Sequence, residues 1–482
     1  MLFCIELVTK GLCTFRGAAR CLEILDQWFD VPTPSHVTIQ NWMMRLGGYL
    51  LKSQPAFQGD WVLIPDHTVE HGKEKCLVLL GVSTKTLENK LKLAHSDVQV
   101  LTILPQKNAT GEAVLEAFRE VTHRFGPPVY IVADKGSDLN KAIRLYKEDH
   151  PKTLEIYDIT HDMAIQLKRE LQDDPRWKAF STRVTQTAQE TRQTELQFLA
   201  PNAMRTKARF LNLGAILTWT EKILNYGLLE DLDDIGAGYF LSEDEVLKLR
   251  IYNGMVQLKP LHQLQGQHYP DKEDFLMALN TLGGDLPENL RQVVLVAADR
   301  NRPQFAQKFD WLEGYREEVA LWSQMYLATK LAMIQVKNKG LNHRTRGELE
   351  AEFSQILEPS SERATAFSNR VLACVQEQAS KVPRGSTWLG TSDIIESILG
   401  KSKIFSKRSP LKTINSLILT IPVFTENLTV DLVKKAIESF SMKMAREMKK
   451  NLFGVSAFLK RKIAFLRLKN MPEGDGPNCR SI

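Results

Sequence analysis

The chain has 482 residues, of which 43% are hydrophobic and 25% are charged. This is ordinary globular usage, so collagen-like, wholly disordered and disulfide-scaffold proteins are excluded, and the length predicts about three domains. No stretch approaches the roughly 18 uninterrupted apolar residues that a membrane-spanning helix needs. The six cysteines form no C-x-x-C pair, and with no signal-peptide pattern at the start a reducing cytoplasm is the expected compartment.

Positive charge is in mild excess, with 63 lysines and arginines against 57 acids and a net charge of +6. Much of it gathers near the end of the chain, where residues 443–469 hold nine basic residues and the single acid Glu447. Such a block suits a nucleic-acid backbone, and the alternative is a solvated amphipathic helix. The residues expected to contact phosphates here are Lys449, Lys450, Lys460, Arg461 and Lys462.

Residues 1–55 show the outline of a helix-turn-helix. Apolar spacing predicts a helix within residues 13–29, two prolines break it, and Ser35 is placed to cap a second helix over residues 36–50. Gln40, Asn41 and Arg45 on that second helix can donate and accept hydrogen bonds toward base edges. The alternative is an ordinary helical hairpin.

Residues 56–170 predict an α/β layer. Short apolar runs indicate strands at 61–64, 76–82, 98–104, 129–133 and 154–157, and amphipathic spacing indicates helices at 110–125 and 137–148. Residues 171–385 read as almost entirely helical, including 287–297 and 305–336. A boundary is expected at Pro383-Arg-Gly385, followed by a helix over residues 391–401. The predicted organisation is therefore 1–55, 56–170, 171–385, 386–440 and a basic tail, 441–482.

Acidic residues follow three of the predicted strands, as Asp66, Asp134 and Asp158. If the first and fourth strands are parallel neighbours, Asp66 and Asp134 meet at one edge of the sheet. Two close carboxylates repel each other unless a cation lies between them, and Mg²⁺ or Mn²⁺ prefers oxygen ligands. The alternative is that each acid is an ordinary turn residue.

A zinc-hydrolase pattern, H-x-x-E-H, occurs at His67 to His71. It requires a helix to bring both histidines to one face, and the segment follows a strand-like run and Pro65. Zinc hydrolysis is therefore not the favoured interpretation.

Four segments together resemble bacterial insertion-sequence transposases of the DDE type. They are WVLIPDHTVEHGKEKCLVLLGV at 61–82, VADKGSD at 132–138, YDITHDMA at 157–164 and TSDIIESILGKSK at 391–403. The resemblance implies an RNase H-like mixed sheet with flanking helices, interrupted by a large all-helical insertion. The 262 residues between positions 134 and 396 suit such an insertion.

The resemblance also implies roles for individual residues. Asp66, Asp134 and Glu396 would form the acidic triad that holds Mg²⁺ or Mn²⁺, as two ions about 3.5–4 Å apart. Asp158 and His161 would form a D-x-x-H element, with His161 either orienting water or phosphate or simply lying in the core. Asp393, one turn before Glu396, is a rival third acid, and Asp138 is a supporting acid or a helix cap. Lys401 and Lys403 would reach DNA phosphates.

The activity implied is Mg²⁺-dependent cleavage of DNA strands at insertion-sequence ends, followed by strand transfer into target DNA. Two or more protomers would pair the double-stranded DNA ends, in a bacterial cytoplasm near the nucleoid. Two alternatives stay open. The chain could be a non-catalytic DNA-binding relative, or an RNase H-like nuclease that cuts strands without joining them.

Overall fold

The computed structural model describes residues 1–54, 56–57, 59–71, 74–106, 109–194, 196–201, 210, 213–227, 307–358, 361–407, 416–453, 461, 463 and 465. The predicted helix at 287–297 and the expected DNA contacts Lys460 and Lys462 lie outside these residues. The chain forms two compact units. Unit 1 comprises Met1–Asp162, Met333–Glu348 and Cys374–Ile482, and unit 2 comprises Met163–Ala332 and Leu349–Ala373.

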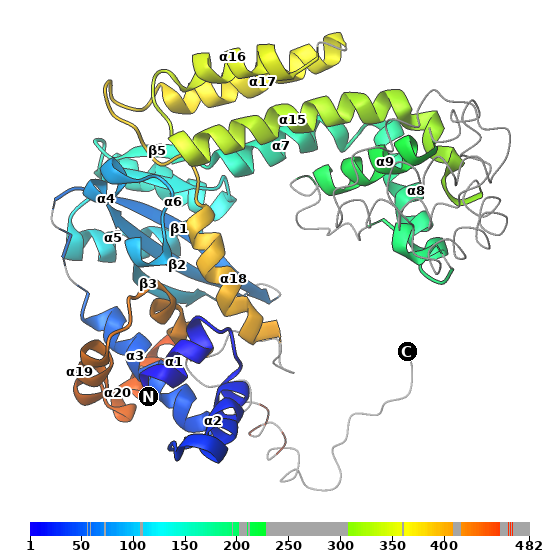
Figure 1. Ribbon diagram of the computed structural model, residues 1–482. Coiled ribbons are helices and arrows are strands. Elements are labelled where there is room, and N and C mark those ends of the chain that lie inside the picture. Colours follow the sequence, from blue (N-terminus) through cyan, green and yellow to red (C-terminus); the bar gives the residue numbers. More distant parts are fainter. Residues whose placement is uncertain are drawn as a thin grey trace, which may run out of the picture. The chain divides into compact units, whose positions relative to one another are not determined.

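A mixed five-stranded sheet forms the centre of unit 1 (Figure 1). Its strands lie in the order β3-β2-β1-β4-β5. β1, β2 and β3 pair antiparallel, whereas β4 and β5 continue the sheet in parallel with β1. The five predicted strands form and the α/β class is confirmed. The first and fourth strands are parallel neighbours, so the condition for Asp66 and Asp134 to meet at one edge is satisfied. The bounds are β1 Trp61–His71, β2 Glu74–Ser83, β3 Gln99–Gln106, β4 Tyr130–Ala133 and β5 Leu154–Tyr157.

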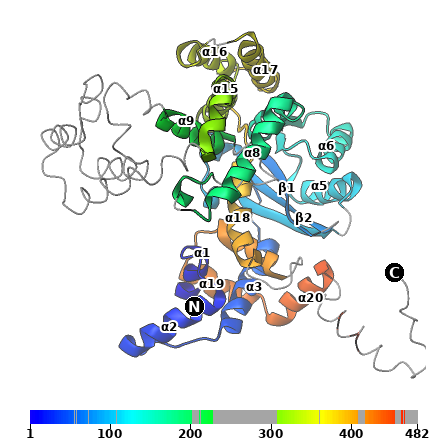
Figure 2. The ribbon, with the colours of Figure 1, turned by 90° about the vertical axis from the view of Figure 1, so that its right-hand side faces the viewer.

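Helices cover both faces of this sheet. α5 (Gly111–Phe125) and α6 (Ser137–Asp149) pack on one face, where Phe118 and Tyr146 join a core with alternate strand residues such as Leu63 and Leu77. α18 (Asp393–Lys407) packs against β1 from the other side (Figure 2). Both faces need helices because successive side chains of a strand point to opposite faces, so apolar residues of these strands lie on each side of the sheet.

The structure corrects the predicted end of the first strand. Asp66 was expected just after it, but β1 runs to His71 and pairs Asp66 with Val78 of β2. β4 pairs with β1 only through Val62 and Leu63, so one side of β1 has no neighbour in the sheet beyond that point. A strand tolerates a proline where one side is unpaired, and Pro65 therefore does not end β1. The zinc-hydrolase pattern likewise lies on a strand.

Residues 416–453 pack against the third helix of unit 1. α3 (His36–Lys52) begins at Ser35, whose hydroxyl accepts a hydrogen bond from the Thr38 amide, as predicted. It packs against η7 (Ser416–Thr425), α19 (Val430–Ser439) and α20 (Met442–Phe453), and against α1 (Leu2–Thr9) and α2 (Phe15–Phe29). The approach is close, because a Cβ at Gly47 would overlap the Leu419 carbonyl oxygen.

Short elements complete the described part of unit 1. They are α4 (Thr84–Asn89) after β2 and η1 (His95–Asp97) before β3. Two sequence-distant segments pair nearby, because Leu341 and Trp388 form an isolated antiparallel bridge. Trp388 also stacks on Tyr130 of β4, whose hydroxyl accepts a hydrogen bond from the Leu389 amide at 3.0 Å. These contacts hold the segment that leads into α18.

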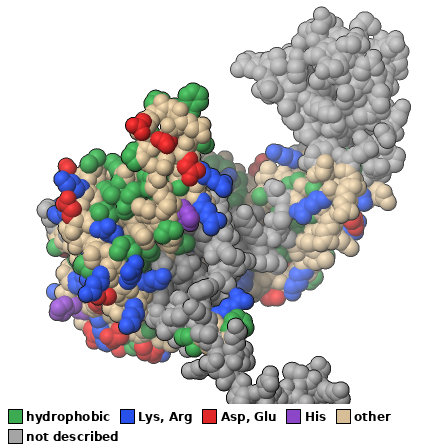
Figure 3. Space-filling model, turned by 90° about the horizontal axis from the view of Figure 1, so that it is seen from below, with side chains coloured by type: hydrophobic (Ala, Val, Ile, Leu, Met, Phe, Trp, Pro, Cys, Tyr) green, Lys and Arg blue, Asp and Glu red, His purple; other side chains and the backbone are tan. Residues whose placement is uncertain are grey.

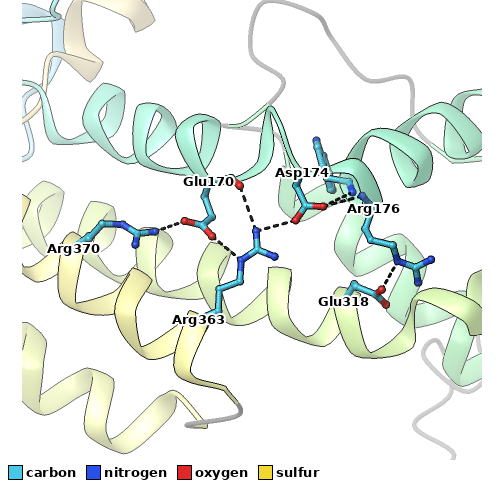
Figure 4. Close-up of polar contacts among 7 residues, drawn as sticks. Glu170, Asp174, Arg176, Glu318, Arg363 and Arg370 are labelled. Atoms are coloured by element: carbon cyan, nitrogen blue, oxygen red, sulfur yellow. Dashed lines mark hydrogen bonds and ion pairs between the residues drawn. The ribbon is translucent and has the colours of Figure 1, made fainter.

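The described part of unit 2 consists of helices and the turns that connect them, with no strand. Trp177, Phe180 and Trp322 are fully buried against one another, and an ion-pair network crosses the helices around them (Figure 4). In that network Arg363 bonds both Glu170, at 2.7 Å, and Asp174, at 2.8 Å. The elements that contribute residues are α7 (Ile159–Leu171), α8 (Pro175–Thr191), η2 (Gln197–Leu199), α9 (Leu213–Gly227), η6 (Asp310–Tyr315), α15 (Arg316–Lys339), α16 (Thr345–Ile356) and α17 (Glu362–Ala379).

In the described residues, no helix is long and apolar enough to cross a membrane.

Candidate functional site

Asp66 is the most perturbed of the acids on the α18 side of the sheet. Burial raises the pKa of its carboxyl to about 7, and the negative charges of Asp134 and Glu396 raise it further. Lys403 and the His67 amide, which donates to Asp66 Oδ1 at 2.6 Å, oppose that shift without overcoming it. Two other predicted acids and one predicted lysine therefore contribute to the electrostatic field at Asp66.

Asp134 directly follows β4, as the sequence predicts. Its Oδ1 accepts a hydrogen bond from the Gly136 amide at 2.9 Å, which closes a tight loop at the end of the strand. A Cβ at position 136 would lie 2.9 Å from Asp134 Oδ1 and 3.2 Å from Asp138 Oδ1. The loop is thus shaped around a glycine between two carboxylates.

Glu396 lies in the first turn of α18 and leaves 49% of its side chain exposed. His161 Nε2 is 3.2 Å from Glu396 Oε1, without the alignment of a hydrogen bond. Partial burial raises the pKa of Glu396, while His161 lowers it, and Asp158 and Asp393 raise it. His161 of the predicted D-x-x-H element therefore contacts the predicted third acid.

The rival acid, Asp393, is engaged elsewhere. Lys337 Nζ lies 2.6 Å from Asp393 Oδ2, and the Thr160 hydroxyl donates to Asp393 Oδ1 at 3.4 Å. Glu396, by contrast, contributes to the electrostatic field at Asp66. Asp393 is not among the charges that shift the pKa of Asp66, whereas Glu396 is.

Asp158 is buried and joins two segments far apart in the chain. Its Oδ1 accepts from the amide of Thr160, at 2.7 Å, and from the amide of His161, at 3.4 Å, in the first turn of α7. Its Oδ2 accepts from both the amide and the hydroxyl of Ser392, just before α18. Asp158 therefore positions both His161 and the start of the helix that carries Glu396. Nothing in the sequence pairs Asp158 with Ser392.

The predicted DNA contacts of α18 divide into two. Lys403 acts on both Asp66 and Glu396, so it lies beside the acidic group. Lys401 Nζ is 3.2 Å from His95 Nδ1, and His95 Nε2 is 2.9 Å from the Ser397 hydroxyl. Lys401 is therefore held against η1 by an imidazole that the sequence did not single out.

The predicted DNA contacts of α3 are partly buried. Arg45 donates to the carbonyl oxygens of Ile437 and Phe440, so its guanidinium ties α3 to α19. Gln40 and Asn41 precede it on the same helix. Their contact with DNA stays a prediction.

The basic end of the chain is described only in part. Lys449 and Lys450 lie in α20, and Arg461 is exposed. On the face drawn in Figure 3, lysines and arginines of the described residues are interspersed with acids. The basic block therefore stays a prediction as a phosphate-binding surface.

A second polar cluster lies on the opposite side of β1 from Asp66. Lys75 Nζ is 3.2 Å and His67 Nε2 is 3.7 Å from Asp138 Oδ2 in the first turn of α6. Burial lowers the pKa of His67, whereas the charges of His67 and Lys75 lower the pKa of Asp138 against the effect of its own burial. The sequence held a signal for this cluster. By strand alternation His67 points to the same face as Leu63, and Lys75 to the same face as Leu77, so two polar side chains enter an otherwise apolar, buried face.

The donor chemistry of the acidic group suits a hard divalent cation, since all three groups offer carboxylate oxygens. Partial burial of Asp66 beside two other carboxylates leaves a negative field that a cation would offset. Within the residues that the structure describes, no three His, Cys, Asp or Glu side chains are drawn together at the distances of a formed metal site.

Comparison with known proteins assigns this chain to no family. No protein-family model matches it, and no curated protein matches it. Among solved structures, the Drosophila P element transposase strand transfer complex is similar over 90% of this chain and 92% of that chain. The two share 12% sequence identity and a TM-score of 0.38, which is too low to assign a fold or a function.

Proposed function

We propose that this chain is a DDE transposase that cleaves and joins DNA strands with Mg²⁺ or Mn²⁺. The observation that carries the proposal is the topology: Asp66 lies on β1, Asp134 follows its parallel neighbour β4, and Glu396 lies in the first turn of α18, which packs against β1. The raised pKa of Asp66, to which burial and the charges of the other two acids contribute, supports this grouping. A fold has little reason to bury one carboxyl beside two others unless their charge is used. The sequence motifs around these acids point to the same class.

The topology supports an RNase H-like catalytic domain with a helical insertion. The mixed sheet carries Asp66 on β1 and Asp134 after its parallel neighbour β4, so both acids belong to adjacent strands. Between Asp134 and Glu396 the chain leaves unit 1 and supplies all of the helical unit 2. That order along the chain is the one expected for an interrupted catalytic domain.

Asp66, Asp134 and Glu396 would hold two cations, as the two-metal mechanism of phosphoryl transfer requires. Bound there, the cations would lower the pKa of water and offset charge on the phosphate. Because Glu396 is half exposed and contacts His161, it is the acid with room to move toward the two aspartates. Lys403 adds a positive charge for the substrate phosphate.

The proposed reaction has two displacements at phosphorus. In the first, the oxygen of water bonds to phosphorus and the bond to the 3′ oxygen breaks, which leaves a 3′-hydroxyl. In the second, that hydroxyl oxygen attacks a phosphodiester of target DNA, and the target's own 3′ oxygen leaves. The chain's residues position an in-line nucleophile and form no covalent intermediate. Paired double-stranded ends and a dimer or larger assembly, acting on DNA in the cytoplasm, belong to the same proposal.

The first test is cleavage of DNA that carries the flanking element ends, with and without Mg²⁺. Wild type is compared with Asp66→Asn and with Asp60→Asn, an exposed acid just before β1. We expect cleavage by wild type and Asp60→Asn and none by Asp66→Asn. Equal cleavage by all three would reject this site.

A strand-joining assay then separates the candidate functions. Joined products support a transposase, whereas cutting without joining indicates a nuclease. Tight end binding with no cutting by wild type indicates a non-catalytic relative.

A further inference from the structure

We propose that the ion pair between Lys75 and Asp138, with the buried His67 imidazole packed beside it, positions Asp66 and Asp134 to bind a divalent cation. We call these three residues the Asp138 clamp. This inference rests on the proposed function, because it concerns the affinity of the same acidic group for metal. None of the three clamp residues is proposed as a ligand.

The clamp reaches Asp66 through β1. His67 and Asp66 are neighbours on the strand, so their side chains point to opposite faces of the sheet. The His67 amide donates to Asp66 Oδ1 at 2.6 Å, and its imidazole Nε2 packs 3.7 Å from Asp138 Oδ2 without a hydrogen bond between them. A shift of β1 that moves the imidazole therefore moves the hydrogen bond that orients the Asp66 carboxylate.

The clamp reaches Asp134 through the loop before α6. Asp134 and Asp138 flank Gly136, where a Cβ would lie 2.9 Å from one carboxylate oxygen and 3.2 Å from the other. Asp138 Oδ1 also accepts from the Leu139 amide at 3.0 Å, which orients it in the first turn of α6. In a loop this tight, holding Asp138 also limits where Asp134 can go.

Lys75 supplies the positive charge that keeps the clamp closed. Its ammonium is 3.2 Å from Asp138 Oδ2, and Asp138 exposes only 8% of its side chain. Burial makes a carboxylate costly to leave unpaired, so loss of the lysine should loosen the loop rather than leave it in place. Removing a residue that contacts and orients a metal ligand typically weakens metal binding 10- to 100-fold.

The test is Mn²⁺ binding to the full chain without DNA, measured by electron paramagnetic resonance and calorimetry. Lys75→Met and Asp138→Asn should each weaken binding about 10-fold or more. Lys75→Arg should restore most of the affinity. The double variant, Lys75→Met with Asp138→Asn, should bind Mn²⁺ no more weakly than the weaker-binding of the two single variants. The reason is that each change by itself already removes the same Lys75–Asp138 ion pair.

Two controls separate the clamp from general damage. Lys147→Met removes a lysine of similar exposure, 37% against 33% for Lys75, that lies 3.7 Å from Glu155 on the same sheet, and it should bind Mn²⁺ as wild type does. Melting temperatures in EDTA show which variants fold. If Asp138→Asn does not fold, Lys75→Met by itself tests the clamp. This variant should fold because Lys75 is partly exposed and methionine keeps most of its aliphatic chain.

The outcomes distinguish this inference from the proposed function. If wild type and Asp66→Asn bind Mn²⁺ equally, the metal site itself is wrong. If Asp66→Asn loses binding while Lys75→Met and Asp138→Asn bind like wild type, the site stands and the clamp is overturned. Weakening by both clamp variants, with Lys147→Met unchanged, supports the clamp.

Discussion

Replacing Asp66 by Asn should stabilise the metal-free protein at alkaline pH. Folding raises the pKa of Asp66 from 3.8 to about 7, so the folded protein binds its proton more tightly than the unfolded chain does. An acid shifted in this direction contributes stability while it is protonated, and that contribution is lost as the pH rises from 3.8 through 7. Asparagine can still accept the hydrogen bond from the His67 amide, but it never ionises.

The size of the effect follows from the two pKa values. Relative to the protonated carboxyl, ionisation lowers the free energy of unfolding by about 2 kcal/mol at pH 5 and by about 4 kcal/mol at pH 8. The free energy of unfolding of wild type should therefore fall by about 2 kcal/mol more than that of Asp66→Asn between these two pH values. Mg²⁺ should reverse the order at pH 8, because a ligand that binds only the folded wild type stabilises it.

The assay is urea unfolding in EDTA at pH 5 and at pH 8, with hydrogen exchange of peptides from β1 and β2 as the signal. These peptides report on unit 1. Asp60→Asn, on an exposed acid next to β1, should follow wild type at both pH values. If wild type and Asp66→Asn lose the same stability between pH 5 and pH 8, Asp66 is not held protonated and the electrostatic description of the site is wrong.

Three further predictions test other parts of the structure. Glu396→Gln should keep DNA binding and abolish cleavage, measured by gel shift and cutting of labelled ends; wild-type cutting would move the third acid elsewhere. Gly47→Ala should destabilise unit 1 by about 3 kcal/mol or more in thermal melts, because the new Cβ overlaps the Leu419 carbonyl oxygen. The control is Gly347→Ala in α16, whose Cβ would meet nothing within 4 Å, and it should be neutral or stabilising in the same melts. Removing residues 454–482 should weaken DNA binding and flatten its salt dependence while keeping α20 on α3; an unchanged salt slope would make that segment's role purely structural.

The sequence by itself determined the local elements of unit 1. Ser35 and Thr110 each accept a hydrogen bond from an amide in the following first turn, and the helices begin where these caps predict. Short apolar runs identified the strands, and Asp134 and Asp158 directly follow two of them. Such features depend on neighbours a few residues away, so they can be read from a single sequence.

Only the tertiary structure decided which distant residues meet. Asp158 bonds Ser392, Asp393 pairs with Lys337 rather than with the acidic group, and Lys75 reaches Asp138 across the sheet. β1 continues past Pro65 because it stays paired with β2 there while its pairing with β4 has already stopped at Leu63, which the residues of β1 alone do not reveal. These pairings depend on sheet order and on packing between segments up to hundreds of residues apart, and neither leaves a local pattern in the sequence.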